Sequence, residues 1–439
     1  MVDLSAPTWR IYRSKLADSA ALEAFKTKLI QWLARFEQFS YLDSNGHSQD
    51  VYGSYDLLLG AGCLDAIQAR AGEGAFEQLT QFKNQYPQEY LFGYLAYDLK
   101  NELEHLDSRH PDPMEWPDLC FFVPEHRISV QGQVLTIASA TQEPEILYEE
   151  ILQTKVQAPQ SAEKIELQPR IQREDYLHTV AQIRQEIGRG NIYEMNFCQE
   201  FFHPACELDP FALFQRLRLK TQTPFAAFFR WQEHFALCAS PERFLAKRGQ
   251  KLISQPIKGT IRRGKTEEED AALKTELFLS PKNRSENVMI VDLVRNDLAR
   301  SCQSGTVQVE ELFGIYSFST VHQMISTVTG VLSDDVSDIE AIKRAFPMGS
   351  MTGAPKLRSM QLIEQLERSR RGLYSGAIGY FAPNGDFDFN VVIRSLLYQQ
   401  ESGYLSLQVG GAIVFDSDPE EEYAECLLKA ERLREVLRG

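Results

Sequence analysis

Residues 375–398 read SGAIGYFAPNGDFDFNVVIRSLLY, with apolar runs on both sides of a turn signal. Pro383-Asn384-Gly385 supplies the turn, because proline fixes the backbone torsion that opens a turn and glycine tolerates the conformation that closes it. Two strands joined by so short a connection pair antiparallel. The segment therefore predicts a β-hairpin with strands at 375–382 and 390–398.

Further strand and helix patterns surround this hairpin. Apolar runs predict strands at residues 225–231, 234–240 and 404–414, and helical spacing of apolar residues predicts helices at 175–188, 286–299, 355–368 and 419–437. Strands that follow one another as hairpins form antiparallel sheets. Covered by these helices, the sheets predict an α+β fold rather than a doubly wound one.

A polar stretch divides the chain. Residues 154–170 contain two prolines and no sustained apolar period, which predicts a linker. Residues 1–153 before it show one helical pattern at 19–36 and strand-like runs at 90–99 and 133–140. We therefore expect an N-terminal region over 1–153 and a second region, with all the candidate chemistry, over 171–439.

The composition excludes several classes of function. The chain has 439 residues, with 46 lysines and arginines against 61 aspartates and glutamates, so its formal net charge is −15. So acidic a protein lacks the basic surface that nucleic acid or anionic lipid requires. No run of about 18 apolar residues and no signal-peptide pattern is present, which predicts a cytoplasmic protein.

Carboxylates are the favoured metal ligands. The seven cysteines include no C-x-x-C pair and the eight histidines no H-E-x-x-H pattern. On the predicted C-terminal helix, Glu422, Glu425 and Lys429 share one face. A solvated acidic helix start with a salt bridge is the commoner explanation of this spacing. The alternative is an oxygen-only Mg²⁺ site that also includes Glu286 of the helix at 286–299.

Two residues near strand ends are candidates for catalysis. Lys258, in SQPIKGTIRRG, is either an ordinary surface charge or, if buried near other cations, a nucleophile with a lowered pKa. Glu242, in SPERFL, is either a partner for Arg243 or a carboxylic acid that protonates a leaving hydroxyl.

Two glycine-rich turns could hold an anionic ligand. FPMGSMTGAPK places Ser350 and Thr352 just before a predicted helix, where backbone N–H groups can bind a carboxylate. Gly410-Gly411 lies near a strand end, where the lack of side chains lets a ligand approach the backbone. Each turn alone is more often a plain structural turn.

Seven segments together are more specific than any one of them. In chain order they are SPERFL, PIKGTIRRG, SENVMIVDLVRND, FPMGSMTGAPK, RRGLYSGAIGY, VVIRSL and GGAIVFDSDPEEEYAE. From about residue 175 to the C-terminus the chain resembles the chorismate-utilising enzyme family. This resemblance implies a large α/β sandwich of two mainly antiparallel sheets flanked by helices, with the N-terminal region packed into the same body.

The resemblance also implies a substrate site. Mg²⁺ would hold the ring carboxylate of chorismate on Glu286, Glu422 and Glu425. Tyr374 and Arg394 would bind the enolpyruvyl carboxylate, Arg394 through charge-assisted hydrogen bonds. The family's anion cradle would be completed by Gly259, Thr260, Gly410, Gly411 and Lys429.

The P-I-x-G-T segment implies which branch of the family this is. It reads Pro256-Ile257-Lys258-Gly259-Thr260, as in the branch that aminates chorismate at C4, whereas anthranilate synthases resemble PIAGT. In the implied mechanism Lys258 attacks ring atom C2 while Glu242 helps the C4 hydroxyl leave, and ammonia then displaces the lysine. The ammonia would come from a glutaminase (amidotransferase) subunit, and the product would feed para-aminobenzoate and folate synthesis.

Three positions depart from the family pattern. Glu194 stands where ammonia-using members usually have glutamine. Gln323, beside His322, stands where anthranilate synthases have a histidine associated with pyruvate loss, which fits retention of the enolpyruvyl group. Asn283 replaces an acidic residue three before Glu286. Anthranilate synthase and a non-catalytic chorismate-binding protein remain as alternatives.

Overall fold

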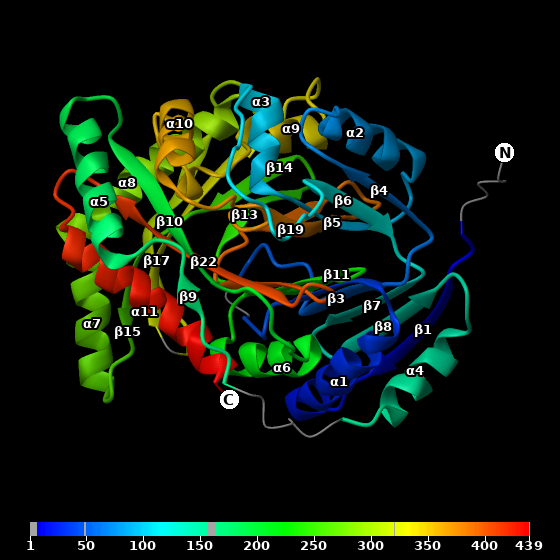
Figure 1. Ribbon diagram of the computed structural model, residues 1–439. Helices are drawn as coiled ribbons and strands as arrows, with labels where there is room; N and C mark the ends of the chain where they lie inside the picture. The colour runs from blue at the N-terminus through cyan, green and yellow to red at the C-terminus, as the bar shows by residue number, and fades with distance from the viewer. Residues whose placement is uncertain (1–6, 48–49, 157–163, 320, 439) are drawn as a thin grey trace.

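Two antiparallel sheets face each other in the computed structural model, which describes residues 7–47, 50–156, 164–319 and 321–438 (Figure 1). The twelve-stranded sheet has the order β1 (Arg10–Lys15), β8 (Val134–Ser139), β7 (His126–Gln131), β3 (Leu57–Ala61), β2 (Gln38–Asp43), β11 (Phe225–Trp231), β12 (His234–Ser240), β21 (Ser395–Gln399), β22 (Tyr404–Ile413), β10 (Glu194–His203) and β18 (Gly353–Ala354), with β9 (Gln168–Pro169) beside β10.

The ten-stranded sheet has the order β15 (Ile257–Arg262), β17 (Val321–Val331), β14 (Lys251–Gln255), β13 (Arg243–Arg248), β20 (Phe387–Asn390), β19 (Ala377–Phe381), β5 (Leu91–Leu95), β6 (Leu119–Val123) and β4 (Asp65–Ala69), with β16 (Gln308–Ser317) beside β17. The predicted α+β class and the antiparallel sandwich are therefore confirmed.

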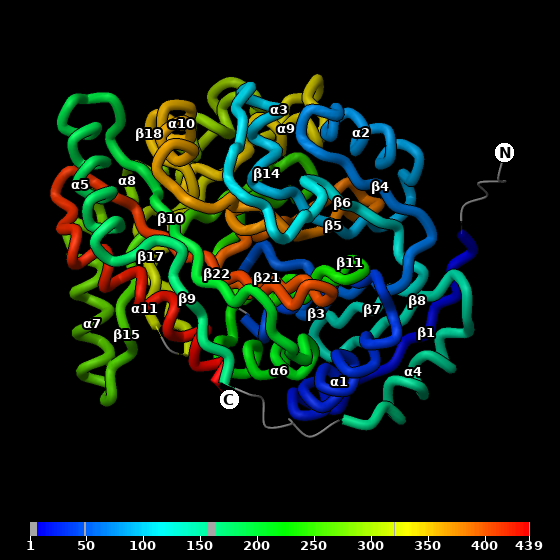
Figure 2. The backbone as a smooth tube through the Cα atoms, viewed as in Figure 1, coloured from blue at the N-terminus to red at the C-terminus, as the bar shows by residue number. Residues whose placement is uncertain are grey.

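Helices cover the outer faces of both sheets (Figure 2). They are α1 (Ser19–Trp32), α2 (Ala75–Gln85), α3 (Lys100–Glu104), α4 (Pro144–Gln153), α5 (Arg173–Gly188), α6 (Pro210–Thr221), α7 (Glu267–Leu279), α8 (Pro281–Ala299), α9 (Asp338–Ala345), α10 (Lys356–Leu366) and α11 (Pro419–Leu437). None of the described helices is long and apolar enough to span a lipid bilayer.

Strand alternation divides the interior into two large apolar cores. On β11, Ala227 and Phe229 belong to the core between the sheets, whereas Phe228 belongs to the core under α1, α5, α6 and α11. Successive side chains of a strand point to opposite faces, so one strand contributes to both cores.

Strands from the N-terminal part belong to both sheets. β4, β5 and β6 lie in the ten-stranded sheet, and β1, β2, β3, β7 and β8 lie in the twelve-stranded one. Within the expected linker, residues 157–163 lie outside the described residues, and Gln168–Pro169 forms β9. The sandwich thus consists of strands from both sides of residues 154–170.

The predicted turn joins two antiparallel strands, but the second of them is β20, at Phe387–Asn390, and not the strand expected at 390–398. β19 and β20 pair across the turn, and the chain then leaves the ten-stranded sheet at Asn390 and enters the twelve-stranded sheet at Ser395. The expectation of one strand over 390–398 was therefore wrong. The Val391 N–H donates to the carbonyl oxygen of Glu242 at 3.0 Å, and Arg394 has φ 51°, which takes it out of extended geometry.

Helix ends that depend on local signals agree with the sequence. The helix expected at 419–437 has those ends, because the Asp418 side chain accepts from the N–H groups of Glu420 and Glu421. The helix expected from residue 286 begins five residues earlier, where Ser280 caps it. α7 was not predicted, and among its residues only Leu277 is buried.

Glycine at position 379 allows β19 to pack closely in the sheet. A Cβ atom there would lie 2.0 Å from the carbonyl oxygen of Asp388. We expect Gly379→Ala to lower the free energy of unfolding by about 1–3 kcal/mol, the usual cost of overpacking a core. Urea unfolding followed by circular dichroism measures this change.

Gly188→Ala is the matched control. Gly188 ends α5, and a Cβ atom there would meet only the Phe415 ring, at an ordinary 3.7 Å. Alanine should leave stability unchanged or raise it slightly, because it favours the helix. Equal losses in both variants would show that close packing at Gly379 is not the cause.

Candidate active site

The amine of Lys258 lies in the gap between the two sheets. Its Nζ donates to Oε1 of Glu194 at 2.6 Å, and the two side chains are only 10% and 7% exposed. Lys258 belongs to β15 of one sheet and Glu194 to β10 of the other. The ion pair therefore connects the sheets and keeps the lysine away from bulk solvent.

Carboxylates, not cations, surround this amine. Burial alone would lower the pKa of Lys258, but Glu194, Glu286 and Glu242 together outweigh burial and raise the pKa. The interpretation that neighbouring cations lower the pKa of this lysine is therefore wrong. Lys258 is an ammonium until a proton acceptor removes its proton.

The backbone beside Lys258 rests against the start of α8. Gly259 has φ 89°, and a Cβ atom there would lie 3.0 Å from Cγ of Asn283. Asn283 is held in turn by the Ser280 hydroxyl, which accepts from its side-chain nitrogen at 3.0 Å. Thr260 follows in β15, pairs with Gln323 and is exposed. The sharp backbone at Gly259 thus fixes where the lysine leaves the strand.

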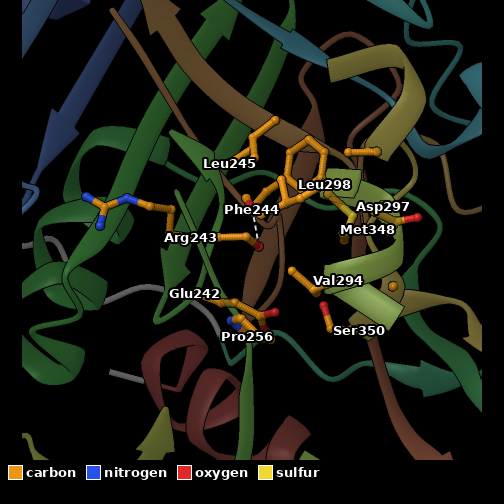
Figure 3. A pocket seen from close by; sticks show the side chains of 13 residues that line it. Glu242, Arg243, Phe244, Leu245, Pro256, Val294, Asp297, Leu298, Met348 and Ser350 are labelled. Atoms are coloured by element: carbon orange, nitrogen blue, oxygen red, sulfur yellow. Dashed lines mark hydrogen bonds between the residues drawn. The ribbon is translucent and has the colours of Figure 1, made fainter. Parts of the chain in front are cut away.

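Glu242 is a buried carboxyl group with an unusual pKa. Burial raises the pKa of Glu242 to about 7, and Ser350, Lys258 and Arg394 oppose the rise. Glu242 and Ser350 lie at the same end of a cavity of about 20 Å³ (Figure 3). A carboxyl group with this pKa can hold a proton near neutral pH and release it, which is what a general acid needs.

Two more carboxylates lie against β22. A Cβ atom on Gly411 would lie 3.3 Å from Oε2 of Glu422 and 4.0 Å from Oε1 of Glu425. Ser417 donates its hydroxyl to Glu422 at 2.7 Å, and Lys429 donates to Glu425 at 2.8 Å and to the carbonyl oxygen of Gly410 at 2.8 Å. The missing side chain at Gly411 lets these carboxylates approach the strand.

Glu286 interacts electrostatically with Lys258, Glu194 and Glu425. Burial raises its pKa, with Glu194 and Glu425 adding to the rise and Lys258 opposing it. Burial and the charge of Glu425 likewise raise the pKa of Glu422. These neighbouring carboxylates concentrate negative charge, and a bound divalent cation would reduce the repulsion between them.

Carboxylate oxygens are suitable ligands for a metal ion, but the spacing of these carboxylates is less suitable. Among the described residues, no three acidic, histidine or cysteine side chains converge closely enough to hold a metal ion. The ammonium group of Lys429 forms an ion pair with Glu425 instead. The residues fit Mg²⁺ in kind, and Lys429 would have to release Glu425 for a metal to be bound.

Arg394 provides a half-buried cation near Glu242. Burial lowers the pKa of Arg394 to about 10, Arg432 contributes in the same direction, and Glu242 opposes it. Within the described residues no carboxylate forms an ion pair with Arg394. A half-buried guanidinium without such a partner is a ready site for an anionic ligand.

Tyr374 and Thr352 are engaged in contacts of their own. The Tyr374 hydroxyl lies 3.6 Å from Sγ of Cys198, on the strand that pairs with Gly410. The Thr352 hydroxyl donates to the Gly349 carbonyl oxygen at 3.1 Å and stabilises its own turn. Tyr374 therefore lies beside β10, and the hydroxyl, N–H and carbonyl oxygen of Thr352 are all hydrogen-bonded within the protein, the last to the Asn196 N–H at 2.8 Å.

His322 and Gln323 lie on β17, the strand that pairs with the β15 strand of Lys258, and His322 makes contacts of its own. The two ring nitrogens of His322 lie 3.0 Å from Oδ1 of Asp270 on α7 and 2.9 Å from the Ser317 hydroxyl. Gln323 is the next residue of β17, so its buried side chain points to the other face of the sheet. His322 thus joins β17 to α7.

Sequence reasoning missed two supporting residues. Ser417 orients Glu422, and Ser280 orients Asn283 beside Gly259. Both serines come just before a helix, so the signal that could have found them is a capping position next to a candidate ligand.

Known proteins resemble this chain over most of its length. The family described as chorismate binding enzyme matches residues 37–435. An Arabidopsis thaliana protein named aminodeoxychorismate synthase, chloroplastic, is 40% identical over 77% of this chain, which spans only 39% of that protein. The Bacillus subtilis aminodeoxychorismate synthase component 1 is 33% identical, with 84% of this chain and 82% of that protein covered.

A solved structure supports the fold independently. Anthranilate synthase component I from Streptococcus pneumoniae superimposes with a TM-score of 0.73 at 25% identity, and the match covers 90% of this chain and 92% of that one.

The buried Glu242 predicts a pH-dependent cost to folding. Its pKa rises from 4.5 in the unfolded chain to about 7 in the folded protein, so the folded protein retains a proton that the unfolded chain releases. Stability should therefore fall as pH rises from 4.5 to 7, by up to about 3 kcal/mol. Glu242→Gln removes this cost, and its stability relative to wild type should rise between pH 5 and pH 8, as measured by urea unfolding.

Glu145→Gln on the exposed side of α4 is the control. Its stability relative to wild type should not change between the two pH values. A constant difference for Glu242→Gln would contradict the assigned pKa.

Proposed function

The chain belongs to the family of chorismate binding enzymes, and from this premise we propose that it is an aminodeoxychorismate synthase component I. It would replace the C4 hydroxyl of chorismate by an amino group and retain the enolpyruvyl group. The names of the relatives from Arabidopsis thaliana and Bacillus subtilis support this branch of the family.

One observation carries the proposal: a lysine amine that is shielded from solvent lies near a carboxyl group that can act as an acid. Lys258 is 10% exposed, and its charge influences the pKa of Glu242, which is about 7. A nucleophile and an acid close together are what a substitution needs when its leaving group is a hydroxyl.

In the proposed first step the neutral amine of Lys258 forms a bond to C2 of chorismate. Both conjugated ring double bonds shift, the C4–O bond breaks, and Glu242 donates the proton with which the hydroxyl leaves as water. Ammonia then bonds to C4, both double bonds shift back, and the C2–N bond to Lys258 breaks. Glu242 recovers its proton from the new ammonium group at C4. The lysine is regenerated and the product is 4-amino-4-deoxychorismate.

Positive groups hold the dianionic substrate. Arg394 would bind the enolpyruvyl carboxylate, because its guanidinium is half-buried and has no carboxylate ion pair among the described residues. Tyr374, Ser350, the backbone at Gly259 and Gly410-Gly411, and Lys429 would complete the site. His322 lacks such support, because its contacts belong to α7 and β16. The side-chain amide of Gln323 is buried and has no hydrogen-bond partner among the described residues, so it stays a candidate.

Mg²⁺ is the proposed cofactor. Glu286, Glu422 and Glu425 would hold it, and when bound it would neutralise the ring carboxylate and these glutamates. We also propose that a glutaminase subunit supplies the ammonia. The support for Mg²⁺ is the family and the excess of carboxylates around Glu286. The support for a glutaminase subunit is that the Bacillus subtilis relative is named as component 1 of its synthase.

The reaction can be tested with the purified chain, chorismate, MgCl₂ and ammonium chloride. We expect 4-amino-4-deoxychorismate, detected as para-aminobenzoate after addition of an aminodeoxychorismate lyase, and no product with excess EDTA. Anthranilate formed without the lyase would overturn the assignment in favour of anthranilate synthase.

Lys258→Ala should lower kcat for C4 amination by at least about a hundredfold, because it removes the nucleophile. The same coupled assay measures this loss. Lys274→Ala, at an exposed position of α7, is the control and should retain wild-type turnover. Unchanged turnover in Lys258→Ala would eliminate the covalent step.

Arg394→Gln should weaken chorismate binding by about 10- to 100-fold, the worth of a charged hydrogen bond of about 1.5–3 kcal/mol. Isothermal titration calorimetry with chorismate and Mg²⁺ measures the Kd. Arg295→Gln, at an exposed position of α8, should bind like wild type. Equal Kd values for wild type and Arg394→Gln would remove Arg394 from the substrate site.

A further inference from the structure

The contact between Glu194 and Lys258 leads beyond the proposed reaction to the activation of its nucleophile. An ammonium has no lone pair, so Lys258 cannot attack a carbon atom until it loses a proton. The structure holds Lys258 among carboxylates that favour the charged form. The reaction therefore needs a defined proton acceptor at Nζ.

Glu194 is the group in contact with that nitrogen. Its Oε1 lies 2.6 Å from Nζ, a distance at which a proton passes directly between the two atoms. The other carboxylates that act on Lys258 have different proposed tasks, since Glu242 serves as the acid and Glu286 and Glu425 as metal ligands. Glu194 is the one without another role.

The backbone of Glu194 is fixed as firmly as that of Lys258. Glu194 pairs with Ala354 across β10 and β18, and its carbonyl oxygen accepts from the Ser359 hydroxyl at 3.2 Å. The Tyr193 N–H donates to the Ala354 carbonyl oxygen at 2.7 Å. The carboxylate is thus aimed at the lysine by a strand end that is hydrogen-bonded on both sides of the residue.

We propose that Glu194 is the catalytic base that takes the proton of Lys258 before the attack on chorismate, and that it holds the amine in position until then. The proton moves from Nζ to Oε1, which leaves a neutral amine and a carboxylic acid. After ammonia has added at C4, the released amine takes the proton back from Glu194. This inference rests on the proposed function and identifies the group that starts its covalent step.

Three variants test the role in the coupled assay, with wild type in parallel. Glu194→Gln keeps the size of the side chain but cannot accept the proton. We expect a loss in kcat of at least tenfold at pH 7 with KM for chorismate changed less than twofold. The loss should shrink as pH rises from 7 to 9, because the amine then loses its proton to solvent.

Glu194→Ala should lose as much activity and regain part of it with added formate, a small carboxylate that can enter the space left by the side chain. Glu194→Asp should retain more activity than Glu194→Gln, since it keeps the charge. Glu89→Gln, a buried carboxylate outside the site, is the control and should behave like wild type.

Wild-type kcat in Glu194→Gln would overturn the proposal. So would a loss that is the same at every pH and is not rescued by formate, since a merely structural role gives that result. Failure of the proposed function is distinguishable, because wild type itself would then produce no 4-amino-4-deoxychorismate.

Discussion

The antiparallel pairing of β10 determines the geometry of the site. On one side β10 pairs with β22, which brings Gly410 and Gly411 and the carboxylates of α11 to the gap between the sheets. On the other side its first two residues pair with β18, and Glu194 reaches across to Lys258. Because every register is fixed by hydrogen bonds, these groups have little freedom to move apart.

The electrostatics of the ligand-free pocket follow from this arrangement. Burial raises the pKa values of Glu242, Glu286 and Glu422, and Glu425 adds to the rise for the last two. Lys258 and Arg394 are the cations that oppose the rise for Glu242. A dianionic substrate that arrives with a divalent cation would change the total charge very little. The protein can thus remain folded with a strongly charged interior and still bind a charged ligand.

Local signals predicted the parts of the fold that local contacts determine. The ends of α11 and the turn of the β19–β20 hairpin depend on neighbouring residues, and both agree with the sequence. The break after Asn390 does not agree with the sequence, because residues 391–394 have the composition of a strand. In the structure, Val391 and Val392 donate to Glu242 and Gly376, and Arg394 leaves extended geometry. α7 has too few buried residues to give an apolar period.

The candidate site, like the fold, was predictable in some parts and not in others. The resemblance drew attention to Lys258, Glu242 and Glu286, and the pKa values show that they influence one another. The surroundings of Lys258 could not be predicted, since its nearest partner is 64 residues away in the chain. Nor could the contacts of His322, because they depend on Asp270 in a helix that the sequence did not reveal.

The pairing of β5 with β19 joins the first hundred residues to the catalytic half at the middle of a sheet. A fragment that began after residue 170 would leave β19 with a bare row of N–H and C=O groups, and such edges recruit strands from other molecules and lead to aggregation. The pairing also spans nearly three hundred residues of chain, so folding must wait for a contact of very high sequence separation. The two halves are therefore expected to fold as one cooperative unit.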